Sequence, residues 1–149
     1  MFRISSLIFI FLVGHCMTAI AADDIDSKYF SRNVRYVMLK DKVALVERDR
    51  PGMATIDEWA QLVFLSADGE HKVSELIAAL GSQYQSGAPK GLAEQTRALV
   101  NDLRGRGYLT LHDQKRKLPY YFAVPVEQQD KERARALMEA DGFLKATPK

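Results

Sequence analysis

Apolar positions at helical spacing predict two consecutive helices near the middle of the chain. Ala60, Val63 and Phe64 follow Asp57, whose carboxylate can accept hydrogen bonds from the free amides at a helix N-terminus. An Asp-Gly turn ends this helix, and a second helix then runs to Gly81 with an apolar stripe formed by Val73, Leu76, Ile77 and Leu80. We expect this pair of helices to be the centre of the fold.

Strands are predicted before these helices. Residues 33–39 and 42–48 are rich in β-branched and aromatic side chains and are separated only by Lys40 and Asp41, a pattern typical of a β-hairpin. Pro51 and Gly52 fit a type II turn, and residues 53–56 follow as a short third strand. Strands followed by helices indicate an α+β domain, in which a three-stranded antiparallel sheet packs on helices.

A third helix is predicted between Leu92 and Gly107, after a polar loop over residues 83–91. On a helical wheel its core face consists of Leu92, Thr96, Leu99 and Leu103. The other face gathers Ala93, Arg97, Asn101 and Arg104, with Val100 at the border. Residues 108–112 alternate like one more strand, which predicts the wing of a winged-helix arrangement. We therefore expect one winged-helix-like domain with three helices over residues 33–113.

The first residues of the chain have the composition of a secretory signal peptide. Residues 1–21 carry one positive charge, at Arg3, then an apolar run and the small residues Ala19 and Ala21, which suit cleavage before Ala22. The apolar run is short for a membrane span of roughly 20 residues, which disfavours a retained anchor. The single cysteine, Cys16, lies inside this segment, so the mature chain has no disulfide. We expect a periplasmic or secreted protein without stable membrane insertion.

Two further segments flank the predicted domain. Residues 22–32 contain three aspartates and little that can pack, so we expect a flexible, solvated lead-in. Residues 114–149 form a C-terminal extension, with a proline-punctuated stretch over 118–126 that should be extended and a charged helix over 127–141. The extension either folds back on the domain or docks on a partner. Its candidate docking anchors are Tyr120, Tyr121, Phe122 and Phe143.

The composition argues against several classes of function. The formal net charge is only +2, without the dense basic surface that nucleic-acid binding requires. No HExxH, GxSxG, Walker or GxGxxG motif is present, and after the signal peptide the histidines are only His71 and His112. Asp57 and Asp68 are better explained as a helix cap and a turn residue than as catalytic carboxylates. We therefore expect no catalysis, metal or cofactor.

Residues 36–111 resemble the PqqD-like family, also called the RiPP recognition element, whose members are winged-helix peptide-binding modules. The resemblance is carried by Ile56, Asp57, Trp59, Ala60, Val63, Phe64, Asp68, Gly69, Val73, Glu75 and Leu76, and by the end of the third helix at Leu103, Gly107, Tyr108 and Leu109. Trp59 departs from the family, which usually has a small hydroxyl residue there. By type it is more often a half-buried core aromatic than a recognition anchor. The signal peptide also departs from the family's cytosolic setting.

The resemblance implies a binding site, since the family takes a leader peptide as an added strand beside its third helix. It places the peptide-binding edge at Met53, Ala54, Thr55 and Ile56, and the helix wall at Ala93, Arg97, Val100, Asn101 and Arg104. The two arginines would meet acidic side chains of the guest, unless they are an ordinary solvated face.

The function expected from this site is an exported, non-catalytic adapter or chaperone. Its partner would be a peptide or protein segment, such as a modified peptide or a maturing enzyme. The alternative is a structural accessory subunit of an envelope complex, which docks through its aromatic extension. The edge at residues 53–56 distinguishes the two hypotheses: a free edge favours peptide capture, and an edge covered by residues 118–126 favours the accessory subunit.

Overall fold

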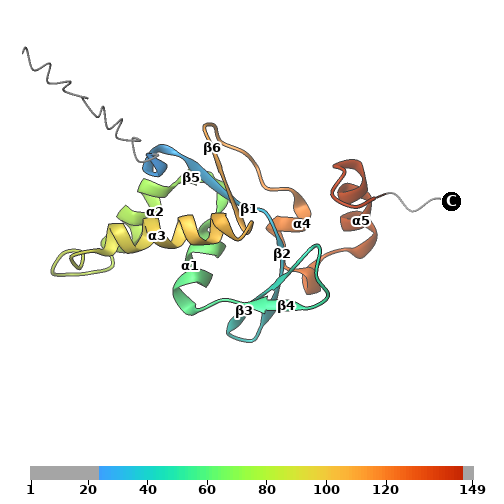
Figure 1. The fold of residues 1–149 in the computed structure, drawn as a ribbon, viewed down its shortest axis with the longest axis horizontal. Coiled ribbons are helices and arrows are strands. Elements are labelled where there is room, and N and C mark those ends of the chain that lie inside the picture. Colours follow the sequence, from blue (N-terminus) through green and yellow to red (C-terminus); the bar gives the residue numbers. More distant parts are fainter. Residues whose placement is uncertain (1–23, 146–149) are drawn as a thin grey trace, which may run out of the picture.

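The computed structural model describes residues 24–145, and the predicted signal peptide over residues 1–21 lies outside them. The fold of the described residues is α+β and winged-helix-like, with two three-stranded antiparallel sheets (Figure 1). The elements before the third helix are η1(Ile25–Ser27), β1(Tyr29–Arg32), β2(Arg35–Leu39), β3(Lys42–Val46), β4(Met53–Thr55), α1(Glu58–Ser66), β5(Asp68–Lys72) and α2(Val73–Gly81). The remaining elements are α3(Leu92–Gly105), β6(Leu109–His112), α4(Tyr120–Ala123), η2(Val126–Gln128) and α5(Lys131–Ala140).

The predicted hairpin and third strand form one of the two sheets, in the order β2-β3-β4. Leu39 pairs with Lys42 at the hairpin end, and Lys40 adopts a positive φ of 51° that lets the chain reverse there. Ala44 pairs with Thr55 and Val46 with Met53, so β4 is the short outer strand of this sheet. The prediction of three antiparallel strands in this region is confirmed.

The other sheet, in the order β5-β1-β6, corrects the predicted lead-in. Residues 29–32, expected to be flexible and solvated, form its central strand, because Phe30 is completely buried and β1 pairs with a strand on each side. Ile25 in η1 is buried as well. The predicted wing strand is present as β6, and it packs beside β1. The three aspartates of this segment suggested a solvated stretch, but the two apolar residues Ile25 and Phe30 anchor it in the core.

Helices α1, α2 and α3 enclose the main core, as predicted. Its largest fully buried side chains are Phe30, Phe64, Leu45, Leu103, Val43, Val63, Val73 and Val100. On α3 the buried face differs slightly from the prediction: Val100 is fully buried, whereas Leu99 is only partly buried. Val100 therefore belongs to the core and is not available for the predicted peptide-binding wall.

Gly69 brings the extension close to the second sheet. Its φ is +80°, and a Cβ at this position would collide with the backbone carbonyl of Arg116. The Arg116 amide donates a 2.8 Å hydrogen bond to the Gly69 carbonyl, so the chain after β6 is held against β5. The predicted Asp-Gly break is thus the start of β5. Because Gly69 has no side chain, the segment between β6 and the C-terminal extension can pass close to it.

The C-terminal extension folds back on β2 (Figure 1). The predicted extended stretch is wrong at residues 120–123, where α4 begins after Pro119, whose carbonyl accepts hydrogen bonds from Phe122 and Ala123. Pro119 is the N-cap of α4, a position at which the missing amide of proline costs no helical hydrogen bond. The predicted charged helix is present as the shorter α5, which begins at the capping residue Asp130. Tyr121 and Phe122 are buried with Ala134 and Met138 in a small core of their own.

Within residues 24–145, none of the helices has the length and apolar character that a membrane span requires.

Candidate peptide-binding site

The outer edge of β4 has no strand beside it in the described part of the chain. β4 pairs only with β3, so the backbone groups of alternate residues point to the open side. Met53 is 57% exposed, while Ala54 is partly buried and packs on the core. The extension contacts the opposite edge of the sheet, at β2. The edge at residues 53–56 is therefore not covered by residues 118–126.

A hollow of about 640 Å³ lies between the start of α1, which follows β4 in the chain, and one face of α3. We call it the α1–α3 hollow. It is lined from α1 and its cap by Asp57, Glu58 and Trp59, and from α3 by Leu92, Gln95, Thr96, Leu99 and Asp102. These α3 residues recur at three- and four-residue steps, so they share one face of the helix.

Local hydrogen bonds fix the turn that joins β4 to α1. The Asp57 carboxylate accepts a 2.9 Å hydrogen bond from the Ala60 amide, as the predicted helix cap requires. The Gln61 side chain donates a 2.9 Å hydrogen bond to the Ile56 carbonyl. These two contacts hold the first turn of α1 against the strand. They place Trp59 at the hollow with 47% of its surface exposed, so it is half-buried as expected but does not belong to the core.

The arginines predicted for the helix wall lie on a different face of α3. Arg97 donates hydrogen bonds of 2.8 and 2.7 Å to the two carboxylate oxygens of Asp26 in η1, and this hydrogen bonding lowers the pKa of Asp26. Arg104 lines a separate small hollow with His112 and Asp113. One residue rotates a helix by about 100°, so positions 97 and 104 cannot share the face of positions 95, 99 and 102.

The other predicted wall residues do not line the α1–α3 hollow either. Val100 is in the core, Ala93 is half-buried and Asn101 is exposed. The α3 side of the hollow consists instead of Gln95, Leu99 and Asp102, with Leu92 and Thr96 beneath them. The helical wheel had assigned Leu99 to the core and the arginines to a free face, and the peptide-binding role of that face stays a prediction. β6 packs on α3, and Arg97 pairs with Asp26 of η1, where that free face was expected.

The four predicted docking anchors of the extension have different surroundings. Tyr121 and Phe122 are 3% and 6% exposed, and Tyr120 and Phe143 are partly buried against the same small core. The rings of Tyr121 and Phe122 meet edge to face, with centroids 4.6 Å apart. These side chains hold the extension together and attach it to the domain.

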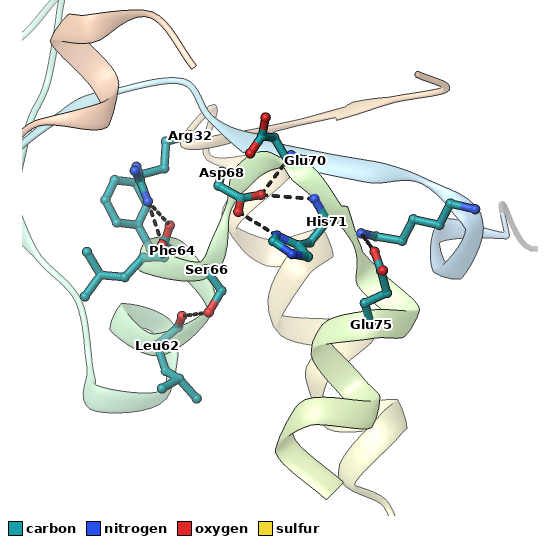
Figure 2. Close-up of polar contacts among 10 residues, drawn as sticks. Arg32, Leu62, Phe64, Ser66, Asp68, Glu70, His71 and Glu75 are labelled. Carbon is teal, nitrogen blue, oxygen red and sulfur yellow. Dashed lines mark hydrogen bonds and ion pairs between the residues drawn. The ribbon is translucent and has the colours of Figure 1, made fainter. Parts of the chain in front are cut away.

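Arg32 is a buried cation that sequence reasoning missed. It is 7% exposed, and its guanidinium donates to the carbonyls of Leu65 at 2.6 Å and Phe122 at 3.1 Å (Figure 2 shows it against the end of α1). Burial lowers the pKa of Arg32. The side chain thus joins the end of α1 to α4. No local pattern in the sequence could reveal this role, because its partners lie far along the chain.

The polar residues at the start of β5 have structural roles. The Asp68 carboxylate accepts hydrogen bonds from the Glu70 and His71 amides and contacts the His71 ring at 2.6 Å (Figure 2). The Glu75 carboxylate accepts from the Lys72 amide at 2.6 Å and so caps α2. These contacts stabilise the turn into β5 and the start of the next helix. Within residues 24–145, no group of three or more His, Cys, Asp or Glu is placed to bind a metal ion.

Comparison with protein-family models matches residues 42–109 to the family Coenzyme PQQ synthesis protein D (PqqD). This segment is PqqD-like. The resemblance found in the sequence is thereby confirmed over those residues. No curated protein and no solved structure matches the chain significantly.

The PqqD-like segment runs from β3 to the first residue of β6, so it contains β4, α1, α3 and the α1–α3 hollow. Strands β1 and β2 and the C-terminal extension lie outside it. The family indicates a peptide-binding module, and a non-catalytic role is compatible with it.

Proposed function

We propose that this chain is an exported, non-catalytic adapter or chaperone that captures an extended peptide or protein segment. The guest adds as a strand to the outer edge of β4, and its side chains enter the α1–α3 hollow. The observation that carries the proposal is the continuity between the two: the unpaired edge of β4 leads through Asp57 into the residues that line the hollow.

Strand addition divides recognition into two parts. Backbone hydrogen bonds along β4 hold any extended guest, and the hollow selects among guests by their side chains. A volume of about 640 Å³ accommodates several side chains and lies within the range typical of ligand sites. Trp59 offers the largest exposed apolar surface there, and aromatic anchors of this kind carry much of the binding energy at peptide interfaces.

The proposed setting is outside the cytoplasm, on the basis of the composition of residues 1–21. The partner would then be an exported modified peptide or a segment of a maturing enzyme. The accessory-subunit hypothesis has less support, because two of its four docking anchors, Tyr121 and Phe122, are buried against the chain's own residues.

The proposal is tested by selecting peptides from a displayed library of random extended sequences against the chain without its predicted signal peptide. Bound peptides should slow amide hydrogen exchange in β4 and leave β2 unchanged. Trp59→Ala should abolish binding. The matched control is Leu62→Ala, since Leu62 is 42% exposed on the same helix and does not line the hollow. Peptides that protect only other strands, or that bind both variants equally, would contradict the proposal.

A further inference from the structure

The α1–α3 hollow is acidic, although the whole chain is slightly basic. Asp57, Glu58 and Asp102 line it, and none of its lining residues is a lysine or arginine. The formal net charge of the chain is +2, so this concentration of carboxylates is a local feature. The remaining lining residues are apolar or neutral, with Trp59, Leu92 and Leu99 as the large apolar side chains.

The three carboxylates differ in whether they already have a hydrogen-bond or ion-pair partner. Asp57 caps α1 through the Ala60 amide, and Asp102 forms a 3.1 Å ion pair with Arg106 one turn further along α3. The structure gives the exposed carboxylate of Glu58 no hydrogen bond or ion pair within residues 24–145. Glu58 also lies in the first turn of α1, where the helix dipole favours a negative charge. It is thus the carboxylate best placed to meet a guest.

Two basic residues of α3, Arg97 and Arg104, are directed away from this surface, whereas Arg106, the C-cap residue, pairs with Asp102. Arg97 is engaged by Asp26, and Arg104 lines the separate hollow near β6. The helix therefore presents acidic and neutral side chains to the α1–α3 hollow and cationic ones to η1 and β6. This separation of charge reverses the electrostatic preference that the arginine wall had implied.

We infer that the guest segment is cationic and apolar, with lysine or arginine alternating with large apolar residues on the face that enters the hollow. This inference rests on the proposed strand capture. In an extended guest, residues two apart point the same way, so an apolar side chain against Trp59, Leu92 and Leu99 has a neighbour beside Glu58 or Asp102. A guest cation also gains from the face of Trp59. An acidic guest meets repulsion instead.

The test uses three synthetic peptides of about ten residues, enough for one strand with flanks. Each alternates leucine with a variable residue along one face and has threonine on the other face, and the variable residue is lysine, glutamate or serine. Trp59 is the only tryptophan of the chain, so its fluorescence reports binding at the hollow. We expect the lysine peptide to bind several-fold more tightly than the serine peptide and the glutamate peptide most weakly. Added salt should reduce the difference.

Paired variants assign the preference to the hollow. Glu58→Gln should reduce the preference for lysine about two- to fivefold, the range of an exposed ion pair. Glu132→Gln is the matched control, because Glu132 is also an exposed first-turn glutamate, on α5. Equal binding of the three peptides, or tighter binding of the glutamate peptide, would overturn the inference and leave strand capture standing. Absence of any fluorescence response would contradict strand capture itself.

Discussion

The two edges of the β2–β3–β4 sheet have opposite surroundings. At β2, the Met38 amide donates to the Glu127 carboxylate at 3.0 Å, the Tyr36 hydroxyl donates to the Ala123 carbonyl at 3.3 Å, and η2 packs alongside. At β4, no described element pairs with the outer backbone groups. Proteins usually cover, shorten or charge an exposed edge, because it is a template for another chain. The C-terminal extension thus covers one edge and leaves the other open.

This comparison explains why the PqqD-like segment needs residues on both sides of it. Residues 42–109 contain the open edge and the α1–α3 hollow but lack the β2 strand and the extension that covers it. Without those residues β3 would lose its partner on the β2 side, and the sheet would have two open edges. The segments outside the family match therefore leave β4 as the one open edge of this sheet among the described residues.

The largest expected effect comes from breaking the attachment of the extension at Arg32. Arg32→Met keeps most of the buried volume but leaves the carbonyls of Leu65 and Phe122 without their donor. Unsatisfied buried acceptors are costly, so we expect the free energy of unfolding to fall by about 3 kcal/mol in urea denaturation. Arg35→Met is the matched control with a much smaller expected loss. Within residues 24–145 the buried Arg35 Nε has no hydrogen-bond partner, and a 3.5 Å contact links the Arg35 guanidinium to Gln129. Equal losses would contradict the role of Arg32.

A smaller effect is expected from pH, at the segment that leads from β6 to the extension. The His112 ring contacts the Ser31 hydroxyl at 2.7 Å, and burial together with the nearby Arg116 lowers the pKa of His112. The unfolded chain therefore binds this proton more readily than the folded protein. The contribution of neutral His112 is complete above the ordinary histidine pKa of 6.5 and is lost as the pH falls below it.

The measurement is the free energy of unfolding across this pH range, for the parent chain and the His112→Gln variant. His112→Gln should flatten the loss of stability on acidification. A pH dependence that survives in His112→Gln would show that another group is responsible.

Much of the fold could be predicted because its signals are local. The hairpin, the Asp57 cap and the apolar stripes of α1 and α2 all depend on residues a few positions apart. What could not be predicted depends on distant contacts. Strand β1 is only four residues long, and its pairing with β5 and β6 has no local periodic signature. Once β1 was missed, the surroundings of α3 were misplaced.

The geometry of the candidate site was predicted only in part for the same reason. The strand at residues 53–55 is recognisable because it follows a turn, whereas the surroundings of α3 required knowing which side of the helix meets η1 and β6. The aromatic residues of the extension were identified as important. However, aromatic side chains that form a small core within the extension and aromatic side chains that dock on a partner look alike in the sequence. Only the position of α4 on β2 separates the two.

The smallest expected effect sharpens the contrast between the edges. Glu127→Ala removes the carboxylate that accepts from the Met38 amide at the β2 edge. Because this contact is exposed, the free energy of unfolding should fall by only about 0.5 to 1 kcal/mol. Hydrogen exchange at Met38 should accelerate, while the amides of β4 keep the rates of the parent chain. If the β4 amides change as well, the two edges are coupled through the sheet. If Met38 does not change, η2 rather than the carboxylate covers β2.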